Sequence, residues 1–349
     1  MRRPALLVTL LFLFTVTAAA GDGFMRFLRS LDQWLEDGQR AGIDTNYIDI
    51  PKYNHQIYMG TYRYWQYYKM EMPFHVENAA AIVPGLQDKD HYIIDAHTSQ
   101  GEYDIGVDWK GFAVELPFSA FSNYLKSIGL AKTGNVWGFR FRYKYLKQMD
   151  GTCNVGNTRI DESTNSLRIL YAEGYYVLNS RRFSLAAGLY ADMVQKHSAG
   201  STLFYLNYYQ SRYNVENLFP SNFDSFRTQQ ISLGAGYAYN YSLLRGRLLF
   251  HGSLVPMFSV WNHMYHDAGI DAKDNPDQWK QWGTFYEAAH SGHARFRLNA
   301  FARFAANYSW NHYVLSLFLN YRNYGYSSTS NLEILNRELD CQLNIIYRF

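Results

Sequence analysis

The sequence predicts an all-β protein, a transmembrane antiparallel up-and-down β-barrel of about 12 strands (10–14), preceded by a short N-terminal amphipathic helix. Segment after segment alternates apolar and polar residues with a period of two, which is typical of strands that have one apolar and one polar face. Aromatic residues make up 18% of the chain, yet its mean hydropathy is only −0.33. A barrel reconciles these values, because only alternate residues meet lipid and the others face a polar interior.

Residues 1–20 are expected to be a cleaved signal peptide. Arg2 and Arg3 form a positive start, residues 5–16 form a short apolar run, and three alanines at 18–20 provide a cleavage pattern. The alternative, a signal anchor or spanning helix, is disfavoured because the apolar run is shorter than the ~20 residues that a span needs. We therefore expect Sec-type export.

Residues 21–46 are expected to be a periplasmic leader with a short helix. Phe24, Phe27, Leu31 and Trp34 recur at helical spacing. Such a helix would plug the barrel, cap its periplasmic mouth or lie on the membrane surface. A partly ordered leader is the alternative.

Residues 47–349 are expected to form the outer-membrane barrel. The last segment shows the alternation most clearly, since Leu339, Leu343 and Phe349 lie on one face and Glu338 and Asp340 on the other. A final aromatic on the apolar face is expected of a strand that closes a membrane barrel. The predicted strands are 55–70, 91–108, 111–118, 135–147, 165–179, 182–195, 201–213, 229–241, 246–262, 293–309, 312–325 and 335–349.

Strand direction follows from a periplasmic C-terminus. The turns near Leu244 and Trp310 are then short and periplasmic, and the loops 214–228, 263–292 and 326–334 are long and extracellular, as expected of such barrels. Upstream the rule is violated, because 148–164 becomes a long periplasmic loop and 179–181 a tight extracellular turn.

Two stretches carry a family resemblance. One is DTNYI at 44–48; the other comprises YYVLN at 175–179, RFS at 182–184, AA at 186–187 and QKHSAGS at 195–201. Over roughly residues 42–349 the chain resembles a Bacteroidetes outer-membrane β-barrel family of unknown function, domain of unknown function family 4421. The resemblance implies a cell-envelope barrel of a Gram-negative bacterium and brings no catalytic residues.

A charged lumen is the first candidate site. The strand faces place basic and acidic side chains inside the barrel, where buried charges must pair or remain hydrated. In particular, Glu338 and Asp340 are expected to pair with the arginines of strand 293–309. The predicted lumen-lining residues are Arg140, Arg142, Lys144, Arg168, Arg295, Arg297, Arg303, Arg322, Arg348, Glu115, Asp192, Glu338 and Asp340.

Two further candidates carry low expectations. His263, His266, Asp267 and His290 flank one long loop and could bind a transition metal, although surface histidines are the default interpretation. Ser198 beside His197 could suggest a nucleophile, but adjacency in sequence does not fix a catalytic geometry, and a tight turn explains these residues. We therefore predict no catalytic residues and no cofactor.

Three functions remain open. The first is a small solute channel with an Arg-rich lumen, and the second is a closed structural or surface-interaction barrel that acts through its loops. An outer-membrane enzyme is the third, and the sequence favours it least. Expected partners are outer-membrane lipid and lipopolysaccharide, the barrel-assembly machinery, and a small solute or surface ligand. The balance of 33 basic and 30 acidic residues disfavours nucleic acid.

Overall fold

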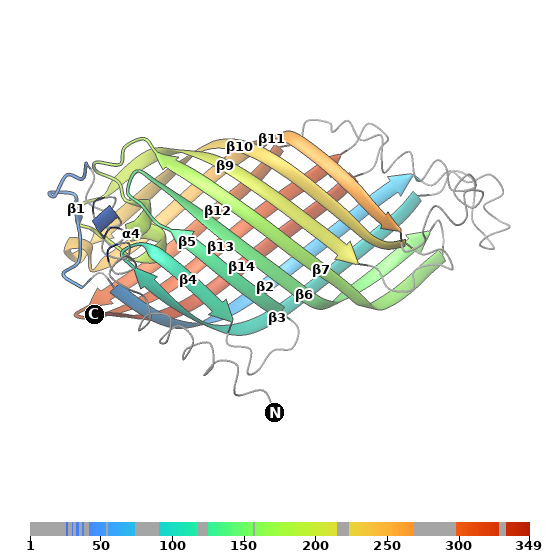
Figure 1. Ribbon diagram of the computed structural model, residues 1–349, viewed down its shortest axis with the longest axis horizontal. Coiled ribbons are helices and arrows are strands. Elements are labelled where there is room, and N and C mark those ends of the chain that lie inside the picture. Colours follow the sequence, from blue (N-terminus) through green and yellow to red (C-terminus); the bar gives the residue numbers. More distant parts are fainter. Residues whose placement is uncertain are drawn as a thin grey trace, which may run out of the picture.

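The computed structural model describes residues 26, 30, 33, 34, 37, 42–53, 55–73, 91–117, 125–155, 158–214, 223–268, 298–327 and 333–349. Twelve antiparallel strands close into a barrel in these residues, which confirms the predicted class (Figure 1). The predicted signal peptide and most of the predicted leader helix lie outside the described residues. No helix in the described part is long and apolar enough to cross a membrane.

The barrel strands follow one another around the wall, and β14 closes the circle by pairing with β2. Their bounds are β2 His55–Pro73, β3 His91–Trp109, β4 Phe112–Pro117, β5 Leu125–Lys132, β6 Trp137–Val155, β7 Thr158–Val177, β9 Ala199–Asn214, β10 Phe223–Leu243, β11 Leu248–Ala268, β12 Leu298–Trp310, β13 Tyr313–Ser327 and β14 Glu333–Arg348. A short 3-10 turn, η1 Leu244–Gly246, joins β10 to β11.

The two ends of the barrel differ. The C-terminus and the connections β3–β4, β5–β6, β7–β9, β10–β11 and β12–β13 lie at one end, which we call the C-terminal end (left in Figure 1). The last residues of β2, β6, β9, β11 and β13 and the first residues of β3, β7, β10, β12 and β14 lie at the opposite end, which we call the loop end.

The β4–β5 hairpin is a short insertion in the wall at the C-terminal end. β4 pairs with β3 from Phe112↔Trp109 to Pro117↔Asp104. β5 pairs with β6 from Lys132↔Phe139 to Leu125↔Leu146. Nearer the loop end, β3 pairs directly with β6, from Tyr92↔Val155 to His97↔Asp150. Two fewer strands therefore surround the interior in that part of the barrel.

Two errors in the predicted strands cancel in the total. β5 was missed because its alternation is weak, with lysines at both ends and two small residues, Gly129 and Ala131, on its inner face. The predicted strand 182–195 is wrong, because that segment contains the helix α4 Leu185–Tyr190 and the two-residue strand β8 Val194–Gln195. Together the two changes reverse the direction of β6 and β7 and place 148–155 and 158–164 at the loop end. The prediction then no longer contains a long loop at the C-terminal end.

Helix α4 lies inside the C-terminal end of the barrel (Figure 1). Ser184 caps it by accepting a hydrogen bond from the Ala187 N–H at 3.1 Å. Residues 183–189 are all buried, because barrel wall surrounds them on every side. Their apolar residues thus contact the inner wall, whereas a period-two interpretation had assigned half of them to lipid.

The segment 178–198 is a plug, tied to the chain that precedes the barrel. The strand β1 Ile48–Asp49 pairs with β8, Ile48 opposite Gln195. The Asp44 N–H donates to the Arg181 carbonyl at 2.8 Å, and the Lys196 N–H donates to the Tyr47 carbonyl at 2.7 Å. The two stretches that carried the family resemblance are therefore one structural unit at the C-terminal end.

Candidate functional site

A cluster of buried ion pairs crosses the middle of the barrel. Lys144 on β6 is fully buried, and its Nζ lies 2.7 Å from Glu338 Oε1 and 2.9 Å from Asp340 Oδ1 on β14. Arg322 on β13 donates from Nη1 to the same Glu338 oxygen at 2.8 Å and to Asp340 Oδ2 at 3.2 Å. Two cations and two carboxylates thus form an alternating arrangement.

A second pair extends this cluster to the other wall. Arg303 on β12 donates from Nη2 to both carboxylate oxygens of Glu173 on β7, each at 2.6 Å. Arg322 Nη2 lies 4.0 Å from Glu173 Oε2 and so links the two groups. The cluster of Lys144, Arg303, Arg322, Glu173, Glu338 and Asp340 has no formal net charge.

Neutral donors complete the coordination of these charges. Asp340 also accepts hydrogen bonds from the Tyr62 hydroxyl at 2.7 Å and from Asn320 Nδ2 at 2.8 Å. Arg303 Nη1 donates to the Tyr205 hydroxyl at 3.2 Å. Buried charges are tolerated when opposite charges and hydrogen bonds surround them. The cluster therefore fills the lumen at this level with fixed side chains.

Aromatic side chains fill the lumen between the cluster and the loop end. Tyr68 stacks on Tyr213 with ring centroids 4.6 Å apart, and Tyr209 stacks on Tyr324 at 3.9 Å. All four rings are at most 2% exposed. Parallel rings at this separation contribute packing beyond their buried area. The interior here is a hydrophobic core lined by tyrosines.

The plug lies inside the C-terminal end, and wall side chains hold its backbone. Asn307 Nδ2 donates to the Gly188 carbonyl at 2.8 Å, and Asn240 Nδ2 donates to the Ser184 carbonyl at 2.8 Å. The Ala191 carbonyl accepts from Gln56 Nε2 at 3.1 Å and also from Arg348 Nη2. The bonds to Gly188 and Ala191 satisfy carbonyls at the C-terminal end of α4, where a helix leaves its carbonyls without partners of its own.

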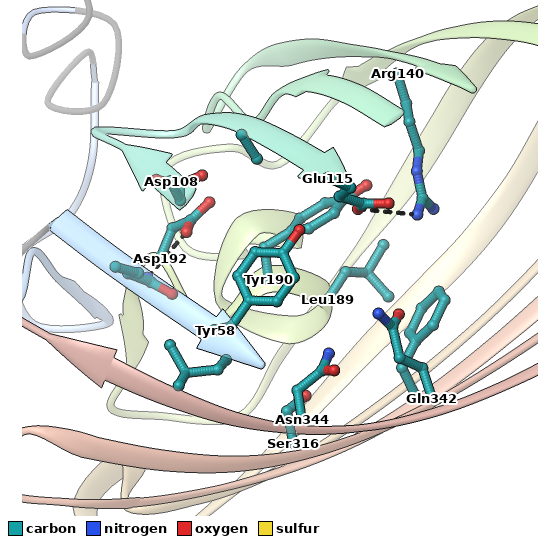
Figure 2. A pocket seen from close by; sticks show the side chains of 14 residues that line it. Tyr58, Asp108, Glu115, Arg140, Leu189, Tyr190, Asp192, Ser316, Gln342 and Asn344 are labelled. Atoms are coloured by element: carbon teal, nitrogen blue, oxygen red, sulfur yellow. Dashed lines mark hydrogen bonds and ion pairs between the residues drawn. The ribbon is translucent and has the colours of Figure 1, made fainter. Parts of the chain in front are cut away.

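A small cavity of about 40 Å³ lies beside the plug inside the barrel (Figure 2). Leu189 and Tyr190 of α4 border it on one side, and Glu115 of β4 and Arg140 of β6, 3.4 Å apart, border it on another. Glu115 also pairs with Arg142. The further residues that line the cavity are Gln56, Tyr58, Asp108, Ala113, Asp192, Ser316, Phe318, Gln342, Asn344 and Ile346.

Asp192 is the acidic residue that the plug contributes to this cavity. It accepts hydrogen bonds from Gln56 Nε2 at 3.0 Å and from the Thr133 hydroxyl. Burial, reinforced by the nearby Asp108 carboxylate, raises the pKa of Asp192 well above its usual range. The cavity is thus lined by polar groups on this side and has room for water.

A chain of three polar side chains faces the inside of the plug from β10 and β11. Asn240 uses its Nδ2 as a donor to the plug, so its Oδ1 accepts from His251 Nδ1 at 2.7 Å. His251 Nε2 then remains an acceptor for the Ser253 hydroxyl at 3.1 Å. Sequence reasoning missed this chain, although His251 and Ser253 stand two residues apart on one strand.

The structure places most of the predicted lumen residues inside the barrel. Interior positions are occupied by Arg140, Arg142, Lys144, Arg303, Arg322, Arg348, Glu115, Asp192, Glu338 and Asp340. Asp192 reaches the interior from the plug and not from a strand. Arg295 and Arg297 lie outside the described residues. The expected pairing of Glu338 and Asp340 with strand 293–309 is wrong for Arg303, the arginine of that strand that the structure describes: Arg303 pairs with Glu173, and Glu338 and Asp340 pair with Lys144 and Arg322.

The predicted lumen-lining position of Arg168 is wrong, because this residue lies on the outer face of β7. Leu167, Ile169 and Tyr171 are fully buried, whereas Arg168 is exposed. The prediction assumed that the apolar face meets lipid, but here the apolar face packs into the tyrosine-lined core. The same reversal explains why Glu173 was missed, because it shares the inward parity of Tyr171.

Neither the predicted metal-binding histidines nor the Ser198–His197 pair forms a site within the described residues. The side chains of His266, Asp267 and His290 lie outside the described residues, and His263 is half-buried on β11. Among the side chains that the structure describes, no three His, Cys, Asp or Glu residues are placed to hold a metal. Ser198 accepts a hydrogen bond from the Ser242 N–H at 2.9 Å, and His197 packs edge-on against Tyr47, as a turn requires.

A family comparison matches residues 42–349 to the family described as "Domain of unknown function (DUF4421)". No curated protein matches the chain. Among solved structures, the translocator domain of autotransporter NalP from Neisseria meningitidis shares 11% identity, with 96% of this chain and 98% of that chain covered at a TM-score of 0.38.

Two further solved structures show weaker overlap. An outer membrane channel from Pseudomonas putida F1 shares 10% identity, with 87% and 99% covered at a TM-score of 0.31. The outer membrane protease OmpT from Escherichia coli shares 8% identity, with 84% and 97% covered at a TM-score of 0.32. Similarities of this size carry no inference about activity.

Proposed function

The chain belongs to this family of unknown function, and we propose that it is a closed outer-membrane β-barrel that acts as a structural or surface-interaction protein. Solutes do not cross it through a permanent pore. The observation that carries the proposal is the six-residue ion-pair cluster, which joins β6 and β7 to β12, β13 and β14 across the lumen. The plug and the tyrosine-lined core close the lumen on either side of it.

The outer surface supports a membrane location. Outward residues such as Leu206, Leu233, Leu254 and Ile345 are about half exposed, which in water would be an extended apolar band. Near the C-terminal end the exposed residues become aromatic, as a membrane interface favours. These aromatic residues are Trp109, Trp137, Trp310, Tyr313 and Tyr347. Export through a signal peptide belongs to the same proposal.

Single-channel recording in planar bilayers tests the closed lumen. The full mature chain should insert without discrete conductance steps at any salt concentration or voltage, whereas a porin inserted in the same bilayer serves as the positive control. Reproducible conductance steps from the wild-type protein would overturn the proposal. Recovery of the protein in the outer-membrane fraction of a Gram-negative host tests the location separately.

Ester hydrolysis is a second candidate function, favoured by the Asn240–His251–Ser253 chain. A nucleophile, a base and an orienting group lie within the distances that serine hydrolases use. Ser253 would transfer its hydroxyl proton to His251 Nε2 as its oxygen attacks an ester carbonyl. The proton then passes to the departing alcohol, and water releases the acid from the acylated serine.

Labelling with a fluorophosphonate separates this function from a purely structural role. Because the three side chains are buried, labelling also requires that the interior opens. Hydrolysis predicts one labelled serine that Ser253→Ala removes and Ser198→Ala preserves. Absence of labelling in the folded barrel, or equal labelling of Ser253→Ala, would exclude it and leave the chain as an anchor for the plug.

A further inference from the structure

Three arginines form a row across the outer face of adjacent strands. Arg168 on β7 is the direct partner of Arg212 on β9, and Arg212 is the direct partner of Arg227 on β10. The neighbours of each arginine along its strand, such as Leu167, Ser211 and Thr228, are buried, so the three arginines share the outer face, where Arg168 is exposed and Arg212 and Arg227 are half-buried. Directly opposed residues in a sheet lie about 5 Å apart at Cβ.

The row continues onto a fourth strand. Tyr145 on β6 is the direct partner of Arg168, and the Arg168 guanidinium lies 5.3 Å from its ring centroid. Lys147 is exposed two residues farther along β6 and so adds a cation diagonal to Arg168. The described outward neighbours of the row towards the C-terminal end, Leu170, Gln210 and Gln229, are uncharged.

Like charges placed directly opposite one another destabilise a sheet unless something compensates for them. Arg212 and Arg227 also interact with other groups of the protein. A guanidinium has five N–H donors in a planar fork, so one arginine can serve more than one acceptor. A phosphate bound along the row could accept from adjacent guanidinium groups at once, which is the geometry in which Arg binds phosphate best.

The position of the row identifies where that phosphate comes from. Counted towards the loop end, Arg168 lies two positions beyond the outward apolar residue Leu170, and Arg212 lies four positions beyond Tyr208. At a rise of about 3.4 Å per residue and a tilt of about 40°, this is roughly 5–10 Å beyond the apolar band. The polar layer of a bilayer leaflet begins at that distance.

We propose that Arg168, Arg212 and Arg227 bind the phosphate groups of a glycolipid in the outer leaflet. The inference rests on the membrane location proposed above. It deepens that function, because it gives the barrel a specific contact with the lipid around it. Tyr145 orients Arg168, and Lys147 supplies long-range attraction for the same anion.

Native mass spectrometry of the full chain in detergent tests the site, with bisphosphorylated lipid A as the probe. The triple variant R168Q/R212Q/R227Q should lose at least about tenfold in affinity, as expected when several charge-assisted contacts are removed. The matched control R63Q/K69Q/R337Q removes three outward cations elsewhere and should bind as the wild type does. Equal binding by the two variants would overturn the proposal.

Two further arms identify the ligand. Lipid A without its phosphates should bind the wild type as weakly as intact lipid A binds the triple variant, and equally tight binding would overturn phosphate recognition. Millimolar inorganic phosphate should fail to displace lipid A; full displacement would assign the row to free phosphate instead. Flotation with vesicles measures membrane insertion independently, so a barrel that inserts but does not discriminate refutes only the arginine assignment.

Discussion

Arg303 and Glu173 face each other across the barrel interior, with Arg303 Nη2 2.6 Å from each oxygen of the carboxylate. They stand on β12 and β7, which lie on separate parts of the wall. Neither side chain is more than 3% exposed. The contact fixes two walls relative to each other, and it does so with charges that have no access to bulk water.

Replacing Glu173 by Gln should therefore be costly. The variant keeps the shape of the side chain but leaves Arg303 without its main counter-charge, and removal of one partner of a buried pair costs about 3–5 kcal/mol. The urea midpoint, followed by the heat-dependent gel mobility of the barrel, measures the loss. Arg337→Gln, on the exposed face, should change the midpoint little. The apolar double variant Glu173→Leu/Arg303→Leu should recover part of the loss; a double variant as unstable as the sum of its singles would contradict this explanation.

Gly188→Ala should loosen the plug. A Cβ at Gly188 would lie 2.6 Å from His251 Nδ1 and 2.8 Å from Asn240 Oδ1, so either the ring or the helix must move. Overpacking of this kind costs about 1–3 kcal/mol. Gly252→Ala is the matched control, because a Cβ there meets no atom within 4 Å. Faster proteolysis within residues 178–198 of Gly188→Ala, and not of Gly252→Ala, is the expected readout, and equal rates would disprove the close contact.

Asp192 should make the barrel less stable as pH rises. Its pKa in the folded protein is raised by burial and by Asp108, so the folded state retains a proton that the unfolded state has already lost above about pH 4. Stability from this group is present at low pH and is lost as pH increases through the folded pKa. Asp192→Asn should flatten the decline in unfolding midpoint between pH 5 and pH 8, while Asp49→Asn on the surface should keep the wild-type slope. A wild-type slope in Asp192→Asn would show that the residue does not titrate in this range.

Tyr209→Ala should open a gap in the tyrosine-lined core. The ring stacks on Tyr324 at 3.9 Å, and its hydroxyl bonds to Asn336, so truncation removes packing and leaves a buried amide without that partner. Such truncations cost about 3–5 kcal/mol. Tyr239→Ala, on the outer face, should cost much less when the protein is in lipid. If chemical denaturation shows similar losses in the free energy of unfolding for the two variants, the interior packing of Tyr209 does not stabilise the barrel more than an outward tyrosine does.

The sequence predicts the barrel well because a closed sheet in lipid leaves a strong period-two signal. The strand from Leu335 to Phe349 shows this: every second residue faces outward, all of them apolar except Arg337, and Glu338 and Asp340 face inward. The signal weakens where both sides of a segment are enclosed. Residues 183–189 are buried all round, so their apolar residues do not indicate which side faces lipid, and a helix was mistaken for a strand.

The candidate site was harder to predict, because it depends on which face of each strand is apolar. On β6 the charged face is inside, as predicted, and Arg140, Arg142 and Lys144 are buried. On β7 the inner face carries Leu167, Ile169 and Tyr171 together with Glu173, so hydrophobicity alone selects the wrong side. Only the partner across the lumen, Arg303, distinguishes the two choices, and that contact has no signature in a single sequence.

The β4–β5 insertion has a geometric consequence for how the interior is filled. The circumference of a barrel grows with strand number, and eight strands leave room for side chains alone. Because β3 pairs directly with β6 towards the loop end, the barrel is narrower there than at the C-terminal end, where β4 and β5 lie between these two strands. Its narrow part can be occupied by facing pairs of rings, whereas its wide part needs a backbone segment of its own. The helix at the wide end is thus a requirement of the shape of the wall.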